Sequence, residues 1–132
     1  MEEQSKIWLL THDVEGQTED QLQQKCVFWF NNEYPKFRGC LFHVPNGGMR
    51  NAREAKKFKQ MGTVRGVADL LLMVGACTYC IELKKKGGRQ SKSQEAWEKQ
   101  IRNNGFDYVI VKSLAEFKAF VAPILDIFKD TY

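Results

Sequence analysis

The stretch from residue 66 to residue 84 reads GVADLLLMVGACTYCIELK and contains two apolar segments separated by a glycine. Each segment, residues 67–74 and residues 77–84, has the length and composition of a β-strand. Gly75 and Ala76 between them can form a two-residue hairpin turn, because glycine readily supplies a positive φ. The stretch therefore predicts an antiparallel hairpin in the sheet of the protein.

Three polar side chains are expected on one face of this hairpin. Successive side chains of a strand point to opposite faces, so Glu82 and Lys84 share a face and lie about 6.5–7 Å apart along the strand. A two-residue turn places Asp69 directly opposite Glu82, whereas a four-residue loop would place it opposite Lys84. In either register the three polar groups lie on the same face.

Two carboxylates that oppose each other on neighbouring strands repel. A shared proton, a nearby lysine or a bound cation would relieve the repulsion. Oxygen ligands at this spacing suit Mg²⁺ or Mn²⁺, and the backbone carbonyl of Leu83 could supply a further oxygen. Lys84 would then orient or deprotonate the attacking water, or neutralise charge that develops on phosphorus. The alternative is an ordinary ion pair of Lys84 with Asp69 or Glu82, which would stabilise the protein little.

The segments around the hairpin predict a single α/β domain with helices against a mixed sheet. Thr18 and Gln21 form a capping box that opens a helix to about residue 32. Its expected core-facing residues are Leu22, Cys26, Trp29 and Phe30. Ser91 and Gln94 form a second capping box, which opens a helix to about residue 104. The expected inward residues of that helix are Ala96, Trp97 and Ile101.

Shorter elements complete the predicted domain, which spans residues 18–132. Strands are expected at residues 40–44 and 108–111, a basic helix at residues 50–61, and a last helix from a Ser113 cap to about residue 128. Residues 1–17 are expected to form an N-terminal extension that ends in a polar loop, and residues 7–10 could add a short strand to it.

Composition narrows the class of protein. The chain has 132 residues, enough for one domain with its own core. No apolar run approaches the roughly 18 residues that span a bilayer, and the acidic N-terminus is unlike a secretion signal. We therefore expect no membrane partner and a cytoplasmic location. Cys26 and Cys40 look like core residues, and Cys77 with Cys80 lacks the second ligand pair that a zinc site requires.

The distribution of charge indicates a polyanionic partner. Residues 36–92 contain thirteen basic residues and three acidic ones. A stretch of this kind is typical of nucleic-acid binding, although a solvated basic face is the alternative. The residues expected to contact DNA phosphates are Arg50, Arg53, Lys56, Lys57, Lys59, Lys85, Lys86, Arg89 and Lys92.

Taken together, the motifs resemble the VRR-NUC domain, a branch of the PD-(D/E)xK nuclease superfamily. The resemblance rests on GVADL at residues 66–70, IELK at residues 81–84 and S-x-x-Q at residues 91–94. Further agreement comes from Glu19-x-x-x-Gln23, from HVPN at residues 43–46, and from Trp97, Ile101 and Gly105. The similarity covers roughly residues 18–122. One departure is Ala68, which stands where the superfamily name has proline.

The resemblance implies a restriction-endonuclease-like core, with a mixed central sheet flanked by helices. It implies hydrolysis of DNA phosphodiester bonds by metal-activated water, with Mg²⁺ or Mn²⁺ as the cofactor. Small stand-alone members, from phages and bacteria, resemble dimeric enzymes that act on branched DNA such as Holliday junctions. For this chain a homodimer acting on branched or duplex DNA is therefore expected.

The resemblance also assigns roles to individual residues. Glu19, Asp69 and Glu82 correspond to acidic metal-site residues, Lys84 to the catalytic lysine and Gln94 to a further site residue; His43, Asn46 and Gln23 are additional candidates. Some of these positions also have local explanations. Glu19 suits the positive end of a helix dipole, and Gln94 serves a capping box. His43 could be an ordinary strand-end histidine, and the role of Asn46 could be limited to shaping the turn.

Two other classes of function remain open from the sequence. One is a DNA-binding module in which the site is structural or degenerate. The other is an RNA nuclease, or an accessory subunit of a larger repair or replication assembly. Intact Asp69, Glu82 and Lys84 favour the enzyme over a pure binding module.

Overall fold

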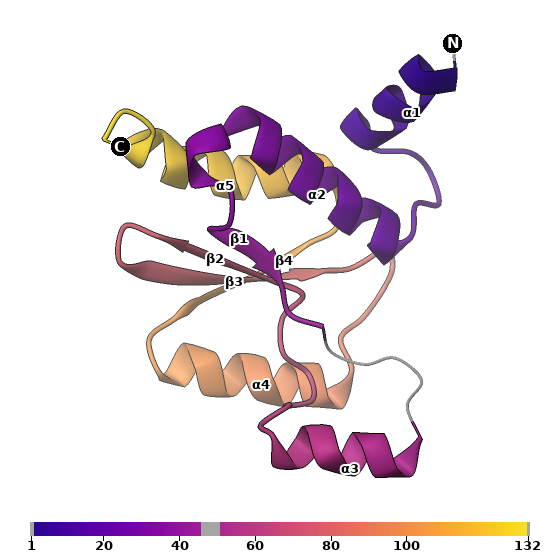
Figure 1. The fold of residues 1–132 in the computed structure, drawn as a ribbon, viewed down its shortest axis with the longest axis vertical. Helices are drawn as coiled ribbons and strands as arrows, with labels where there is room; N and C mark the ends of the chain where they lie inside the picture. The colour runs from indigo at the N-terminus through magenta and orange to yellow at the C-terminus, as the bar shows by residue number, and fades with distance from the viewer. Residues whose placement is uncertain (1, 46–50, 132) are drawn as a thin grey trace.

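Four strands form one mixed sheet in the order β1-β2-β3-β4. The computed structural model describes residues 2–45 and 51–131 (Figure 1). β1 pairs with β2 and β2 pairs with β3 in antiparallel fashion, whereas β4 is parallel to β3. Their bounds are Leu41–His43 for β1, Leu70–Val74 for β2, Cys77–Leu83 for β3 and Asp107–Val111 for β4.

The hairpin of β2 and β3 has the two-residue turn that the sequence predicts. Val74 pairs with Cys77, and Leu70 pairs with Ile81 at the far end. Gly75 and Ala76 both have a positive φ, of 60° and 61°. A type I′ turn requires this conformation at both central residues, and it matches the twist of the flanking strands. The predicted register of the hairpin is therefore confirmed.

Two helices cover one face of the sheet, and one helix covers the other (Figure 1). The first face packs against α2 (Glu19–Glu33) and α5 (Leu114–Phe128). Thr18 and Gln21 form the predicted capping box of α2, and Ser113 caps α5 as predicted. The main core lies in this layer. Its fully buried members include Leu22, Cys26, Phe30, Leu70, Leu72, Ile81, Leu83, Phe117, Val121 and Leu125.

The opposite face packs against α4 (Lys92–Asn103) and has a smaller apolar cluster. Ala68, Cys80 and Tyr108 are buried there, with Trp97 and Ile101 of α4 packed against them. The prediction that Ala96 also points inward was wrong, because Ala96 is exposed. Trp97 and Ile101 are four residues apart and form one stripe, and the helical rotation per residue turns Ala96 away from it.

The N-terminal segment differs from its prediction. Residues 2–11 form α1 (Glu2–Thr11), so the predicted short strand at residues 7–10 was wrong. Glu2 and Glu3 lie in the first turn, where acidic side chains favour a helix, and the Thr11 hydroxyl donates to the Ile7 carbonyl at the other end. None of the residues of α1 is buried, and the helix projects beyond the sheet (Figure 1).

Asp13, which follows α1, caps the distant helix α5. Its Oδ1 accepts the backbone N–H of Leu114 at 2.7 Å, and its Oδ2 accepts that of Ala115 at 3.1 Å. The segment after α1 is thereby attached to the layer of α2 and α5. A division of the chain at residue 17 remains a prediction.

Two elements remain. A short 3₁₀ helix, η1 (Pro35–Phe37), leads into β1. The helix α3 (Ala52–Gln60) forms the predicted basic helix with Asn51 as its cap, and it lies beyond α4, away from the sheet (Figure 1). All four cysteines are free thiols, with Cys26 and Cys80 buried. None of the helices within residues 2–45 and 51–131 is long and apolar enough to cross a lipid bilayer.

Candidate active site

The candidate site lies where β2 begins and β3 ends. Because these strands are antiparallel, the start of one is beside the end of the other. Asp69 immediately precedes β2, Glu82 is the penultimate residue of β3, and Lys84 directly follows β3. Glu82 and Lys84 contact residues of β4 and α4, so both point to the face that α4 covers.

Asp69 is held by the backbone of the neighbouring strand. Its Oδ2 accepts the N–H of Leu83 at 2.8 Å, and its side chain is half-buried. Burial raises the pKa of this carboxyl group, Glu19 raises it further, and the Leu83 N–H opposes the shift. The sequence predicted either repulsion between Asp69 and Glu82 or an ion pair with Lys84, whereas the structure adds a backbone donor that partly stabilises the Asp69 carboxylate.

Glu82 is a fully buried carboxyl group that has only part of its hydrogen-bonding capacity satisfied. Its exposed fraction is 0%. Oε1 accepts the Tyr108 hydroxyl at 2.8 Å, while Oε2 is buried and has no hydrogen-bond partner. Burial raises the pKa of Glu82, the polar groups of Tyr108 and Gln90 and the charge of Lys84 oppose the shift, and the charge of Asp69 adds to it. A buried carboxylate oxygen without a partner is costly, so it indicates a site for a proton or a cation.

Lys84 is also buried, with an exposed fraction of 7%. Its ammonium donates to the Gln94 side-chain oxygen at 2.8 Å, and the same oxygen accepts the backbone N–H of Ser91 at 2.7 Å. Gln94 therefore serves the predicted capping box of α4 and also holds Lys84. The ion pairs among the described residues are Arg102–Glu98 and Lys129–Asp126, so Lys84 forms no direct ion pair with Asp69 or Glu82.

A glycine permits the start of α4 to lie this close to the strand ends. Gly66 has a φ of 83°, and a Cβ at this position would be 2.2 Å from the Ser93 carbonyl oxygen. Any side chain would therefore displace either the loop before Asp69 or the first turn of α4. Gly66 thus allows the first turn of α4, which carries Gln94, to lie close to the segment that leads to Asp69.

Glu19 and His43 approach Asp69 from other elements. Glu19 is the first residue of α2, and its Oε2 accepts the backbone N–H of Lys85 over a long 3.5 Å. His43 is the last residue of β1, and its Nδ1 lies 2.8 Å from the backbone oxygen of Asp69. Gln23 is half-buried on α2, one turn after Glu19. Asn46 lies outside the described residues.

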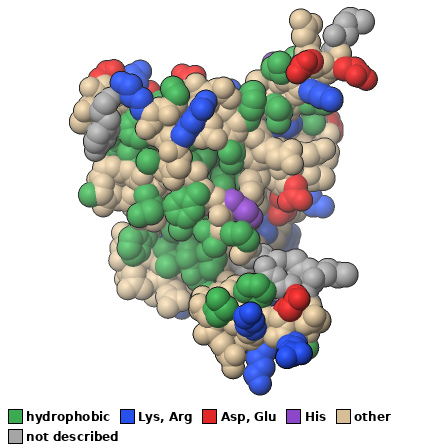
Figure 2. Space-filling model, viewed as in Figure 1, with side chains coloured by type: hydrophobic (Ala, Val, Ile, Leu, Met, Phe, Trp, Pro, Cys, Tyr) green, Lys and Arg blue, Asp and Glu red, His purple; other side chains and the backbone are tan. Residues whose placement is uncertain are grey.

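The predicted DNA-contacting residues are exposed wherever the structure describes them. Arg53, Lys56, Lys57 and Lys59 lie on α3, which has no buried residue, and Figure 2 shows basic side chains projecting from this helix. The others are in the loop after β3 and at the start of α4, namely Lys85, Lys86, Arg89 and Lys92. Arg50 lies outside the described residues.

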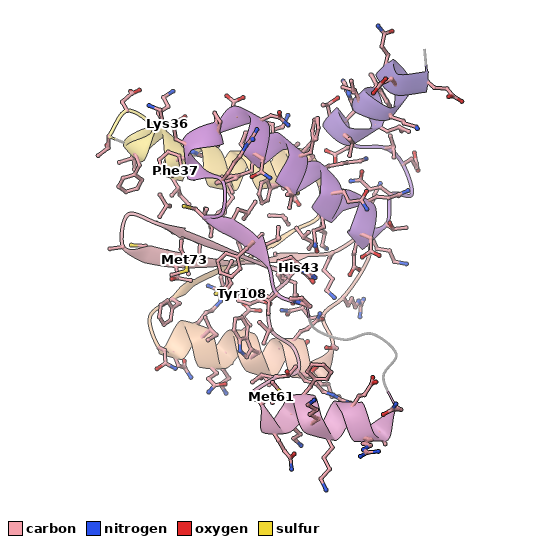
Figure 3. All side chains as sticks on the ribbon, viewed as in Figure 1. Lys36, Phe37, His43, Met61, Met73 and Tyr108 are labelled. Carbon is pink, nitrogen blue, oxygen red and sulfur yellow. The ribbon has the colours of Figure 1, made fainter. Side chains whose placement is uncertain are left out.

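Two residues of the site were not found from the sequence. Tyr108 of β4 donates to Glu82, and Figure 3 shows its side chain between the sheet and α4. Gln90 donates to the Tyr108 hydroxyl over 3.4 Å and to Glu98 at 2.9 Å. A tyrosine in a buried strand requires a partner for its hydroxyl, which was a usable signal for Tyr108. No sequence pattern marks Gln90.

The donor set fits a hard divalent cation in part. Within the described residues, no three His, Cys, Asp or Glu side chains are grouped so that they alone could hold a metal ion. Magnesium, however, is typically held by one or two carboxylates, with water and substrate phosphate as its other ligands. The unpartnered Oε2 of Glu82 and the adjacent Asp69 carboxyl group match that requirement.

The fold and site together define an α/β domain with a buried polar site at the ends of two antiparallel strands. No protein-family model and no curated protein matches the chain by sequence. By structure it is similar to a solved protein described as "VRR_NUC domain protein", with a TM-score of 0.70 and 24% sequence identity. The alignment covers 83% of this chain and 89% of that one. The fold is thus VRR-NUC-like, and the predicted α/β fold is confirmed.

Proposed function

We propose that the protein is a metal-dependent DNA nuclease that hydrolyses phosphodiester bonds. The observation that carries this proposal is the fully buried Glu82, whose Oε2 has no hydrogen-bond partner although Asp69 and Lys84 are close by. A site built only for stability would give that oxygen a donor. The VRR-NUC-like fold supports the same assignment.

Each polar group has a role in this proposal. Asp69 and Glu82 would hold a Mg²⁺ or Mn²⁺ ion, with the Leu83 carbonyl and Glu19 as further oxygen donors nearby. When bound, the cation would polarise a phosphate oxygen and make water a stronger nucleophile near neutral pH. Lys84, which Gln94 holds in place, would orient the water or stabilise negative charge in the transition state. Burial of these groups strengthens their electrostatic effects.

The exposed basic residues would bind the substrate. Lysine and arginine side chains on α3 and on the loop after β3 can contact phosphates without reading the base sequence. The substrate would be duplex or branched DNA. A symmetric dimer could present two such sites to the two equivalent strands of a four-way junction, which is why we include a homodimer in the proposal.

The proposal is tested with purified protein and end-labelled DNA. Linear duplex, flap, nicked and four-way-junction substrates are incubated with Mg²⁺, with Mn²⁺, with Ca²⁺ or with EDTA. We expect cleavage with Mg²⁺ or Mn²⁺, none with EDTA, and binding with little cleavage in Ca²⁺, because the looser coordination of Ca²⁺ positions water poorly.

A Glu82→Gln variant is the control for contaminating nucleases, since it retains the size of the side chain and an acceptor for Tyr108. Cleavage that continues undiminished in EDTA would contradict the metal-dependent mechanism. DNA binding without cleavage of any substrate would instead support a non-catalytic DNA-binding module.

A further inference from the structure

Tyr108 is held rigidly between the sheet and α4. It is the second residue of β4 and has an exposed fraction of 4%. The ring of Trp97 lies 6.0 Å from the tyrosine ring, and the guanidinium carbon of Arg102 lies 5.6 Å from the ring centroid. Arg102 also donates to the backbone oxygen of Tyr108 at 2.6 Å. The position of the hydroxyl is therefore set by contacts with α4.

The direction of the hydroxyl proton follows from its neighbours. A tyrosine hydroxyl has one proton to donate, and it can also accept. The Gln90 amide nitrogen donates to the hydroxyl oxygen, so the proton is free to point to Oε1 of Glu82, 2.8 Å away. The hydroxyl therefore acts as a donor to Glu82 and as an acceptor from Gln90.

This arrangement distinguishes the two oxygens of Glu82. Oε1 has a partner, and Oε2 has none. Because the hydroxyl is fixed, it favours one orientation of the carboxyl group over its rotated alternatives. One carboxylate oxygen then occupies the position of Oε2, where it remains available to a cation.

We propose that Tyr108 is a positioning residue of the metal site, whose hydroxyl fixes the Glu82 carboxylate so that Oε2 is presented to the cation. This inference rests on the proposed function, since it assumes that Glu82 is a metal ligand. Residues that hydrogen-bond to a metal ligand orient it, and their loss typically weakens metal binding by about 10- to 100-fold.

The test compares two tyrosine-to-phenylalanine variants of the whole chain. Tyr108→Phe removes the hydroxyl and keeps the ring in its apolar contacts. Tyr34→Phe is the matched control, because Tyr34 is also buried and its hydroxyl donates to a carboxylate, Asp126, at 3.3 Å. Mn²⁺ is titrated into each protein, and the free ion is measured from its electron paramagnetic resonance signal.

We expect the dissociation constant for Mn²⁺ to rise about 10- to 100-fold in Tyr108→Phe and to stay unchanged in Tyr34→Phe. In Glu82→Gln the additional change Tyr108→Phe should have little further effect, because the tyrosine acts through Glu82. Melting in EDTA verifies that each variant is folded. A purely structural role would lower the melting temperature of Tyr108→Phe and leave its Mn²⁺ affinity intact.

The outcomes separate this inference from the proposed function. If the wild type binds Mn²⁺ and Tyr108→Phe binds it equally well, the positioning role is wrong and the metal site stands. If the wild type binds no Mn²⁺, both the metal site and the role of Tyr108 are overturned.

Discussion

At the scale of single residues, the site combines two carboxyl groups whose charge is poorly solvated. Burial is the largest influence on both, and it raises the pKa of Asp69 and of Glu82. A raised carboxyl pKa means that the folded protein binds the proton more tightly than the unfolded chain does. Stability is therefore lost as the pH rises through the folded pKa, in the absence of metal.

The loss of stability with rising pH leads to a prediction for Asp69→Asn. Asparagine carries no charge and retains an oxygen that can accept the Leu83 N–H. In EDTA near pH 7 we expect the variant to melt about 2–5 °C above the wild type, which corresponds to roughly 1 kcal/mol for a domain of this size. The difference should shrink as the pH is lowered from 7 through the raised pKa of Asp69, because the wild-type carboxyl group then becomes protonated.

Differential scanning fluorimetry across this pH range provides the measurement. Mg²⁺ stabilises a protein by binding only its folded state. It should stabilise the wild type more than the variant, because Asp69→Asn lacks one of the two carboxylates that would hold the ion. Asp69→Ala is the matched comparison: it also removes the charge but leaves the Leu83 N–H without an acceptor, so it should melt below Asp69→Asn. A melting temperature of Asp69→Asn below that of the wild type at neutral pH would show that the charged form of Asp69 stabilises the fold.

At the scale of elements, the site depends on the close approach of α4 to the strand ends. Gln94 in the first turn of α4 contacts both Ser91 and Lys84. Gly66 makes this approach feasible, because a Cβ there would overlap the backbone of Ser93. The helix start and Lys84 are thus coupled through one side chain and one glycine.

Two glycine substitutions separate the effect of the close contact between residue 66 and Ser93 from the effect of backbone strain. Gly62 and Gly66 both have a positive φ, of 99° and 83°, but a Cβ at Gly62 would meet nothing within 4 Å. Gly62→Ala should therefore incur only the conformational cost of about 1–2 kcal/mol. Gly66→Ala should destabilise the protein by about 1–3 kcal/mol more, because overpacking adds to that cost.

Urea unfolding measures both free energies, and cleavage assays on the folded variants measure function. We expect Gly66→Ala to reduce cleavage as well, since it displaces Gln94 relative to Lys84. Equal stability of the two variants would show that α4 moves aside at no cost.

The basic helix α3 leads to a prediction about binding. Changing Lys56, Lys57 and Lys59 to glutamine should weaken DNA binding and decrease the salt dependence of affinity. Each lost phosphate contact lowers the slope of log affinity against log salt by about 0.9, so the decrease should be up to about three. The same change at three other exposed lysines, Lys99, Lys112 and Lys129, is the control. An unchanged slope in the α3 variant would mean that α3 does not touch the DNA backbone.

The elements also show which features were predictable. The Gly75-Ala76 turn predicted the hairpin register, and the alternating direction of side chains along a strand predicted the face shared by Glu82 and Lys84. The bond from Tyr108 to Glu82 was not predictable, because the strand pattern does not tell which residue of β4 lies beside β3. Asp13 caps α5 from about a hundred positions away, and no local pattern reports such a contact. The helix α1 has no buried residue, so it lacked the periodic signal that identifies helices.

At the scale of the whole molecule, one chain offers a small footprint for branched DNA. A twofold dimer would place two equivalent sites on two strands of a junction. We predict that the protein sediments at about twice its monomer mass of 15.3 kDa and that it cleaves a four-way junction faster than linear duplex. Analytical ultracentrifugation and competition cleavage assays measure the two properties. A monomer that cleaves both substrates equally would contradict the dimeric arrangement and leave the nuclease assignment intact.

The central claim is that the groups at the ends of β2 and β3 form a catalytic site, and Lys84→Ala tests it most directly. The measurement is the single-turnover cleavage rate in Mg²⁺, together with DNA affinity in Ca²⁺, for the wild type, Lys84→Ala and the exposed-lysine control Lys129→Ala. We predict that Lys84→Ala loses about 10²- to 10⁴-fold in rate at near-wild-type affinity, the scale expected for one acid–base or electrostatic group, while the control changes neither. A folded Lys84→Ala protein that cleaves DNA at the wild-type rate would contradict the account.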